Sequence, residues 1–280
     1  MRSDRTHKRA VMSKTGRPYA SAAILAVIIL VCLLAELLMP YDPTFMNLSE
    51  INLPPGNGHM FGTDTLGRDL FSVILYGGRI SIFIGLLATV ISTALAVVYG
   101  TVAGLASDRI DDLMMRLAEI LMSVPQLLMV MFIQAIMGKA TVISISVVIG
   151  ITGWMAVAKM VRSEVKQLRT SGFVLAARTM GGGFFYILRK HLMPNFMSAI
   201  MFMIVTNIES AMITESTLSF LGLGLPTDVI SWGSLMILSQ RAMLTGSWWM
   251  IIIPGVFLVT TLICVTEIGE YLRGRKRRRQ

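Results

Sequence analysis

A series of long apolar runs, separated by short polar segments, is the feature that most constrains this sequence. The runs cover residues 19–39, 80–105, 113–137, 141–161, 196–218 and 248–268. A helix of about 20 apolar residues is long enough to cross the hydrocarbon core of a bilayer, so each run can form one span. We therefore expect an all-α integral membrane protein with six transmembrane helices.

The composition excludes a large soluble domain. Of the 280 residues, 54% are hydrophobic and 15% are charged, whereas a soluble domain carries about 25% charged residues. The first run could instead be a cleaved signal peptide, but it exceeds the ~7–15 residue apolar core of such peptides. No small-residue cleavage site precedes Pro40, so we expect a retained span. Pro125 interrupts the third run and predicts a kink there.

The basic residues indicate the orientation of the chain. If both termini are cytoplasmic, all but four of the 25 Lys and Arg residues lie on the cytoplasmic side, as the positive-inside rule requires. The four on the outer side are Arg68, Arg79, Lys139 and Arg241. Contact with anionic membrane lipid accounts for the net charge of +9, so we expect no nucleic-acid partner.

This topology divides the chain into four parts. We expect a basic cytoplasmic tail at 1–18, the first transmembrane helix and an outer loop at 19–78, a core with five transmembrane helices at 79–270, and a second basic tail at 271–280. A long cytoplasmic loop lies inside the core, at about 162–194.

The cytoplasmic loop contains a short amphipathic pattern. Apolar and small residues recur there at helical spacing: Phe173, Ala176, Ala177 and Met180. Three glycines beginning at Gly181 interrupt the pattern, and Leu192 and Pro194 lead into the fifth span. We expect two short helices at the cytoplasmic surface; the alternative is an ordinary interfacial loop whose basic residues contact headgroups.

Polar residues in the fifth run are candidates for lining a translocation pathway. They are Asn207, Glu209, Ser210, Thr214 and Glu215. The neutral three share one helix face. An ionisable side chain at membrane depth costs about 2.5–3.5 kcal/mol, so the two glutamates should face protein or water. The alternative for the neutral stripe is hydrogen bonding between helices.

The sequence carries no catalytic or metal-binding pattern. Gly138-Lys139 is followed by Ala140 and lacks the earlier glycine of a Gly-x4-Gly-Lys-Ser/Thr phosphate-binding loop. The three histidines are scattered, and Cys32 and Cys264 lie in separate apolar runs. We expect no catalytic residue, no metal and no cofactor in this chain.

Three separated motifs carry a family resemblance. The first is HMFGTDTLGRD at 59–69 with YGGRIS at 76–81, the second is LAARTMG at 175–181 with LMP at 192–194, and the third is ESTLSFLGLG at 215–224 with SWG at 231–233. In this order they resemble the permeases of ABC importers, in the dipeptide, oligopeptide and nickel group. Tyr41-Asp42-Pro43 resembles the second, C-type subunit.

The resemblance implies a type I importer architecture and a set of partners. These would be a sister permease, two ATP-binding subunits that hold ATP and Mg²⁺, an extracytoplasmic binding protein and the lipid of a bacterial or archaeal cytoplasmic membrane. The solute would be a peptide, nickel or a metal chelate. The alternative is an ion-coupled secondary transporter subunit that works without an ATPase.

The resemblance also assigns roles to residues. Phe173, Ala176, Ala177, Met180, Gly181, Leu192 and Pro194 would form the loop that docks on an ATP-binding subunit, with Leu175 standing where the family usually has glutamate. On the outer side Asp64, Arg68, Asp69 and Trp232 are candidates for docking the binding protein. Pairing among the three charged residues, which would brace the outer loop, is the alternative.

Overall fold

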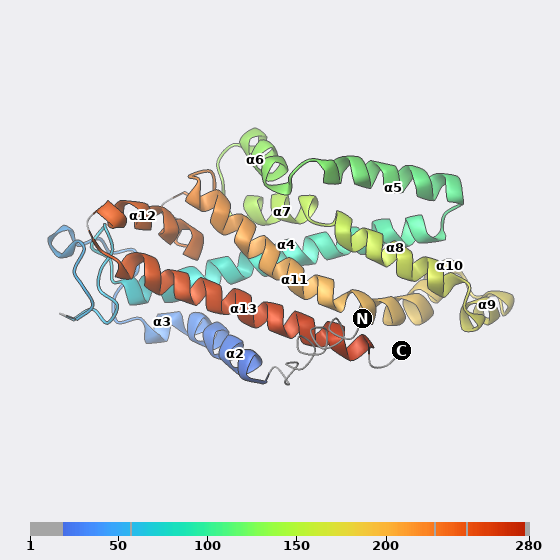
Figure 1. Ribbon diagram of the computed structural model, residues 1–280, viewed down its shortest axis with the longest axis horizontal. Helices are drawn as coiled ribbons and strands as arrows, with labels where there is room; N and C mark the ends of the chain where they lie inside the picture. The colour runs from blue at the N-terminus through green and yellow to red at the C-terminus, as the bar shows by residue number, and fades with distance from the viewer. Residues whose placement is uncertain (1–18, 57, 227, 245, 278–280) are drawn as a thin grey trace, which may run out of the picture.

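The computed structural model describes residues 19–56, 58–226, 228–244 and 246–277, and the described chain is helical with no strands (Figure 1). The α-helices are α2 (Tyr19–Leu33), α3 (Ala35–Leu38), α4 (Leu70–Leu105), α5 (Asp108–Ser123), α6 (Gln126–Met137), α7 (Val142–Thr152), α8 (Met155–Arg169), α9 (Gly172–Thr179), α10 (Phe184–Ile187), α11 (Met193–Phe220), α12 (Trp232–Leu244) and α13 (Trp249–Arg277). A 3-10 turn, η1, covers Leu48–Glu50, and a π-helical turn, η2, covers Leu188–Leu192. The expected all-α class is confirmed.

Three to five of these elements have the length and composition of membrane spans. Three continuous helices qualify: Leu70–Leu105, Leu188–Phe220 and Trp249–Arg273. Two bent pairs also qualify if each pair is one span, namely α5 with α6 and α7 with α8. The first apolar run forms the 15-residue α2, followed by the short α3. Six spans therefore stay a prediction.

The two bent pairs have different sequence signals. α5 and α6 meet at an angle of 86°, and Pro125 lies at the break, so the expected kink is confirmed and is sharper than a bend within one helix. Proline keeps the preceding residue out of the helical region, and Val124 is extended. α7 and α8 meet at 45° across Gly153 and Trp154, a break that the periodicity of the fourth run did not predict.

α4 extends along the bundle and packs against α7, α8 and α11 (Figure 1). Two of its glycines, Gly100 and Gly104, let α8 approach closely. A Cβ at Gly100 would lie 2.5 Å from the Ala158 carbonyl oxygen, and one at Gly104 would lie 2.8 Å from Cγ1 of Val165. A pair of small residues four apart is a common device for close helix packing in membranes, and here it positions α8 and the segment that follows it.

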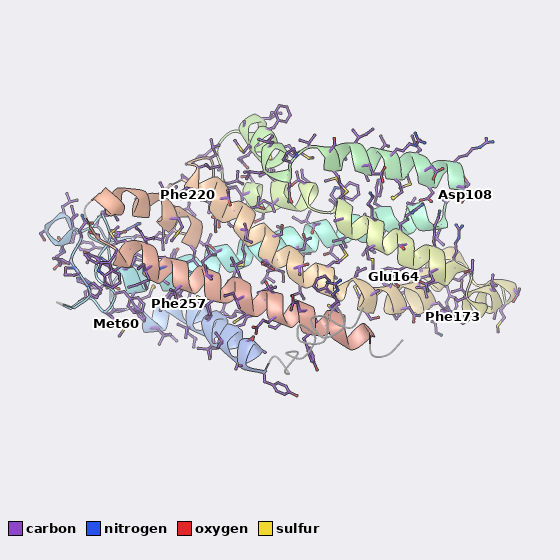
Figure 2. All side chains as sticks on the ribbon, in the orientation of Figure 1. Met60, Asp108, Glu164, Phe173, Phe220 and Phe257 are labelled. Carbon is purple, nitrogen blue, oxygen red and sulfur yellow. The ribbon has the colours of Figure 1, made fainter. Side chains whose placement is uncertain are left out.

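The bundle has two distinct ends (Figures 1 and 2). We call the end that carries residues 40–69 the loop end, and the end that carries α9 the α9 end. Met60 lies at the loop end, and Phe173 and Asp108 lie toward the α9 end. α13 extends from the loop end toward the α9 end, while α2 begins near the middle of the bundle, where the Ser21 hydroxyl contacts the Glu267 carboxylate of α13.

Apolar side chains form three buried clusters along the bundle. Leu70, Ile74 and Trp232 belong to a cluster at the loop end. A second cluster, near the α9 end, joins α8 to α9 and the start of α11. A third lies between them, where α4, α6, α7 and α11 meet. These clusters anchor the segments that carry the candidate sites.

Gly100→Ala is expected to lower the free energy of unfolding by about 1–3 kcal/mol, the usual cost of overpacking a core. The matched control is Gly255→Ala, because a Cβ at Gly255 meets nothing within 4 Å. Thermal unfolding of the purified protein in detergent measures both. Equal stability of the two variants would contradict the close approach of α4 and α8.

Candidate functional site

The α9 segment presents a surface at one end of the bundle. One side of the helix is anchored, because Val174 is fully buried with Val161 and Val165 of α8. The other side is exposed and carries Phe173 and Leu175, and Met180, directly after the helix, has 86% of its surface accessible. The helix expected from the spacing of apolar residues is therefore present.

Glycines end α9 by a tight turn. Gly181 has a φ of +81°, a conformation that glycine adopts without strain. The Gly182 N–H donates to the Ala177 carbonyl at 2.9 Å, and the Met180 N–H donates to the Ala176 carbonyl at 3.0 Å. These bonds satisfy carbonyl groups that a helix end leaves open. The expected glycine break is confirmed.

The exposed surface of α9 and the following segment border an open hollow of about 560 Å³. Its lining comprises Phe173, Ala176, Ala177, Met180, Gly181, Gly182, Gly183, Tyr186 and His191. The His191 ring lies 6.1 Å from the Phe173 ring and 5.6 Å from the Tyr186 ring, measured between centroids. Five of the seven residues assigned to the cytoplasmic loop are thus brought together here.

The other two assigned residues lie further along the chain. Leu192 is fully buried in the second core cluster, and Pro194 is exposed in the first turn of α11. The second short helix is not separate, because α10 and η2 continue directly into α11. The wider π-helical turn precedes Pro194, which cannot donate a backbone hydrogen bond.

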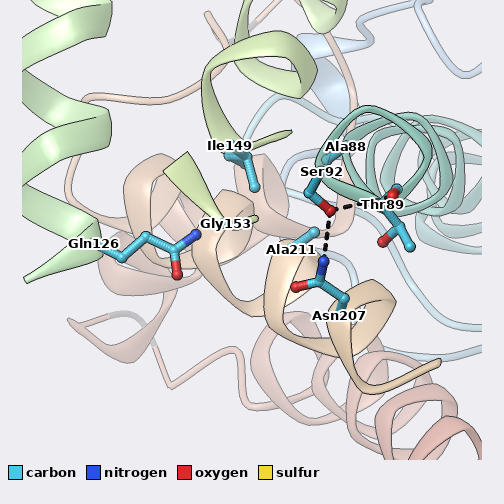
Figure 3. A pocket seen from close by; sticks show the side chains of 8 residues that line it. All are labelled: Ala88, Thr89, Ser92, Gln126, Ile149, Gly153, Asn207 and Ala211. Carbon is cyan, nitrogen blue, oxygen red and sulfur yellow. Dashed lines mark hydrogen bonds between the residues drawn. The ribbon is translucent and has the colours of Figure 1, made fainter. Parts of the chain in front are cut away.

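A polar recess lies where both helix breaks meet (Figure 3). The Asn207 side-chain amide donates to Ser92 Oγ at 2.5 Å, and the Ser92 hydroxyl donates to the Thr89 carbonyl at 3.1 Å. Gln126, the first residue of α6, and Gly153, which follows α7, complete the lining with nearby apolar residues. The buried Thr89 hydroxyl has no hydrogen-bond partner there. Of the pathway candidates, Asn207 contributes to this recess.

Glu215 has a different environment. It is fully buried and accepts hydrogen bonds from the hydroxyls of Ser231 at 2.8 Å and Ser219 at 3.0 Å, with a longer one from Ser216. A Cβ on Gly233 would lie 2.8 Å from a Glu215 carboxylate oxygen. The carboxylate therefore joins α11 to the start of α12 instead of facing a pathway.

The remaining pathway candidates are spread around α11. Ser210 is exposed, Thr214 donates to the Ser210 carbonyl at 2.8 Å, and Glu209 is half-buried. The structure therefore separates the five residues into a recess, a core contact and a more open side of the helix. A helical-wheel projection of α11 could not separate these residues, because tertiary packing decides which helices lie against each side of α11.

The candidate residues at the loop end are all buried. Arg68 Nε donates to Asp64 at 2.7 Å, whereas Asp69 caps α4 by accepting from the Ser72 N–H at 2.8 Å. Asp69 also lies 2.9 Å from His59 Nδ1. The brace expected between Asp64 and Arg68 is present, whereas Asp69 contacts His59 and Ser72 instead of Arg68.

Trp232 packs at the centre of the loop-end cluster. Its indole N–H donates to the Ile74 carbonyl at 2.9 Å, and its backbone N–H donates to Ser81 Oγ at 3.0 Å. Because all four candidates are buried, they shape this end. Its exposed surface contains other apolar residues: Phe45, Met46, Leu48 and Met60.

Two groups of residues were missed in the sequence. The pair Gly100 and Gly104 had a visible signal in its four-residue spacing. Asp111 contacts Arg162 and Lys166 and had a weaker sequence signal. The sequence indicates only which side of the membrane these two cations occupy, and does not show that they lie beside Asp111. Within the described ranges, no three His, Cys, Asp or Glu side chains form a group that could hold a metal ion.

Comparison with known families gives two matches. The family described as "Binding-protein-dependent transport system inner membrane component" matches residues 96–278. The family described as "N-terminal TM domain of oligopeptide transport permease C" matches residues 19–55.

Individual relatives cover most of the chain. The dipeptide transport system permease protein DppC of Bacillus subtilis is 37% identical over 262 residues, which are 94% of this chain and 82% of that protein. The oligopeptide transport system permease protein OppC of B. subtilis is 38% identical over 250 residues, covering 89% of this chain and 81% of that protein. OppC of Haemophilus influenzae is 35% identical over 256 residues, covering 91% and 82%.

Glu215→Ala is expected to destabilise the fold, because it leaves the Ser219 and Ser231 hydroxyls without their acceptor. Each unsatisfied buried group costs about 1–3 kcal/mol. The matched control is Glu209→Ala, which removes a half-buried glutamate from the same helix. Thermal unfolding in detergent compares the two, and an equal, small effect would contradict the role assigned to Glu215.

Proposed function

Since the chain belongs to the family of binding-protein-dependent transport system inner membrane components, we propose that it passes peptides through the cytoplasmic membrane as the C-type permease of an ABC importer. Relatives named as dipeptide and oligopeptide permeases cover about nine tenths of the chain and support a peptide substrate. The chain is the transporter's membrane subunit, and its partners hydrolyse ATP with Mg²⁺.

The exposed α9 surface is the main observation that supports contact between this chain and an ATP-binding subunit. An exposed apolar helix beside a hollow is suited to contact a protein partner. Residues 172–194 contain basic side chains and no Asp or Glu, so an acidic rim on that partner would be complementary. An ATP-binding subunit docks here, with Phe173, Ala176, Ala177, Met180 and Gly181 at the contact. Leu192 and Pro194 hold the segment on α11.

The full complex contains two ATP-binding subunits, a sister permease and an extracytoplasmic binding protein. The sister permease covers the open side of α11. The loop end faces the binding protein, and the buried Asp64, Arg68, Asp69 and Trp232 keep its exposed rim in shape. Leu175 places an apolar group in the ATPase contact where the family usually has glutamate.

The chain crosses the membrane six times with both termini in the cytoplasm. α2 with α3 forms the first span, each bent pair forms one, and the three long helices form the rest. Both α2, read backward from Leu33 to Tyr19, and α13, read forward, lead away from the loop end, and the Ser21–Glu267 contact joins them, which supports termini on one side. We divide the chain, as the apolar runs predict, into a basic tail at 1–18, the first span and outer loop at 19–78, a core with five spans at 79–270 and a second basic tail at 271–280.

Solute moves past the open side of α11 near the polar recess. Glu209, Ser210 and Thr214 line this route, Asn207 lies beside it in the recess, and Glu215 fixes the helix that carries them. Neutral amides and hydroxyls can both donate and accept hydrogen bonds. They therefore suit the backbone of peptides with different side chains.

Co-purification and transport test this function together. A tagged chain is expected to bring down two ATP-binding subunits and a sister permease. Proteoliposomes of that complex, supplied with binding protein and a labelled dipeptide, are expected to show uptake that needs ATP and persists with a protonophore. Uptake without ATP that a protonophore abolishes would instead identify an ion-coupled transporter.

Gly181→Asp is expected to reduce ATP-driven uptake at least tenfold while the protein still inserts in the membrane, because it places a carboxylate on the surface that meets the ATPase. Gly138→Asp is a matched control. Gly138 and Gly181 have φ of +80° and +81°, and a Cβ at either meets nothing within 4 Å. Similar uptake by both variants would show that this surface does not couple transport to ATP.

A further inference from the structure

Three basic residues on α8 face acidic residues on α5. Lys159 Nζ lies 2.8 Å from Glu119 Oε1, and Arg162 Nε donates to Asp111 Oδ1 at 2.6 Å. Lys166 contacts the same Asp111 carboxylate and lies 3.9 Å from Asp108. The residue numbers rise along α8 as they fall along α5, so the helices are antiparallel. We call these contacts the α5–α8 charge ladder.

Asp111 is the central member of the ladder. It is fully buried and is shared by two cations one helical turn apart on α8. Removing one member of a buried, paired group leaves an uncompensated charge, which is far more costly than loss of an exposed pair. The ladder therefore holds α5 at a defined register on α8.

Few apolar contacts attach α5 to the bundle. Only Asp111, Met115 and Ala118 are buried on this helix, while apolar side chains such as Leu113 and Leu117 are exposed. One further polar contact comes from the Tyr99 hydroxyl, which donates to the Met114 carbonyl at 2.6 Å. The position of α5 thus depends strongly on the ladder.

α8 is tightly joined to the α9 surface. Only Thr170 and Ser171 separate the two helices, and the Ser171 hydroxyl donates to the Leu168 carbonyl at 2.6 Å. Val174 of α9 packs with α8 in the second core cluster. At the end of α8, Arg169 donates to the Gly104 carbonyl of α4 at 3.1 Å. A displacement of α9 is therefore passed to α8.

The opposite end of α5 leads to the polar recess. The helix ends at Ser123, and the 86° break at Pro125 places Gln126 in the recess lining. A continuous connection therefore joins α9, α8, the ladder, α5 and the recess (Figure 1).

We propose that Asp111 is a positioning residue that makes α5 follow α8, so that movement of α9 reaches the helix break beside the recess. This inference rests on the proposed function of α9 as the ATPase contact. The proposal gives the buried ion cluster around Asp111 a role in energy coupling. A cluster that only stabilised the fold would change the amount of folded complex, but not the amount of solute taken up per ATP hydrolysed.

Uptake per ATP hydrolysed is the quantity that tests this proposal. Proteoliposomes of the full complex, with binding protein and a labelled dipeptide, are assayed for the rate of dipeptide uptake and for the rate of ATP hydrolysis. Asp111→Asn is expected to lower uptake per ATP at least tenfold while hydrolysis continues. Asp111→Glu is expected to stay within about twofold of the wild type, because it keeps the charge.

Asp112→Asn is the matched control, since Asp112 is exposed on the next position of the same helix. It is expected to match the wild type. If the Asp111→Asn variant takes up as much dipeptide per ATP hydrolysed as the wild type, the proposal is wrong. ATP-driven uptake by the wild type would still support the proposed function in that case. Absence of ATP-driven uptake by the wild type would instead reject the proposed function itself.

A cation that shares Asp111 gives a second test should Asp111→Asn prevent assembly. Arg162→Gln leaves Asp111 paired with Lys166, so the carboxylate keeps a partner, and is expected to lower uptake per ATP hydrolysed. Lys159→Gln is the control, because its pair with Glu119 is exposed, and it is expected to match the wild type. Wild-type uptake per ATP hydrolysed in the Arg162→Gln variant would overturn the proposal.

Discussion

The close packing of α4 against its neighbours is the contact on which the rest of the structure depends. Glycine at 100 and 104 lets the backbone of α8 approach closely, and Gly85 leaves room for α11, where a Cβ would lie 2.8 Å from the side-chain Cγ of Met212. Packing of this kind replaces the hydrophobic driving force that helices lose when lipid surrounds them. Because α8 leads into α9, and α4 and α11 both line the recess, α4 connects the partner surface to the transport route.

Charged groups inside the bundle act as specific connectors. Asp64 with Arg68 braces the loop end, Glu215 joins α11 to α12, and Asp111 joins α5 to α8. Burial makes an unpaired charge costly, so each carboxylate restricts its helix or loop to the arrangement that supplies its partners. The polar contacts thereby determine position where apolar packing alone would permit sliding.

Much of this architecture could be predicted from local sequence. The helical class follows from the apolar runs, the bend at Pro125 follows from the proline ring, which keeps Val124 out of the helical region, and the turn after α9 follows from three consecutive glycines. The break at Gly153 could not be predicted, because the apolar pattern continues across it. Asn207 and Glu215 were correctly placed on one helix, but their separate surroundings could not be deduced from that helix alone.

The sequence by itself determined that this chain is helical, lives in a membrane and belongs to a family of importer permeases. These properties depend on local hydrophobicity, turn residues and short motifs, all of which can be recognised without contacts between distant segments. Only the tertiary structure decided that Glu215 is a core contact, that Asn207 lines a recess and that Asp111 meets two cations. Each of these depends on which helices lie side by side, and residues up to 115 positions apart make the contacts.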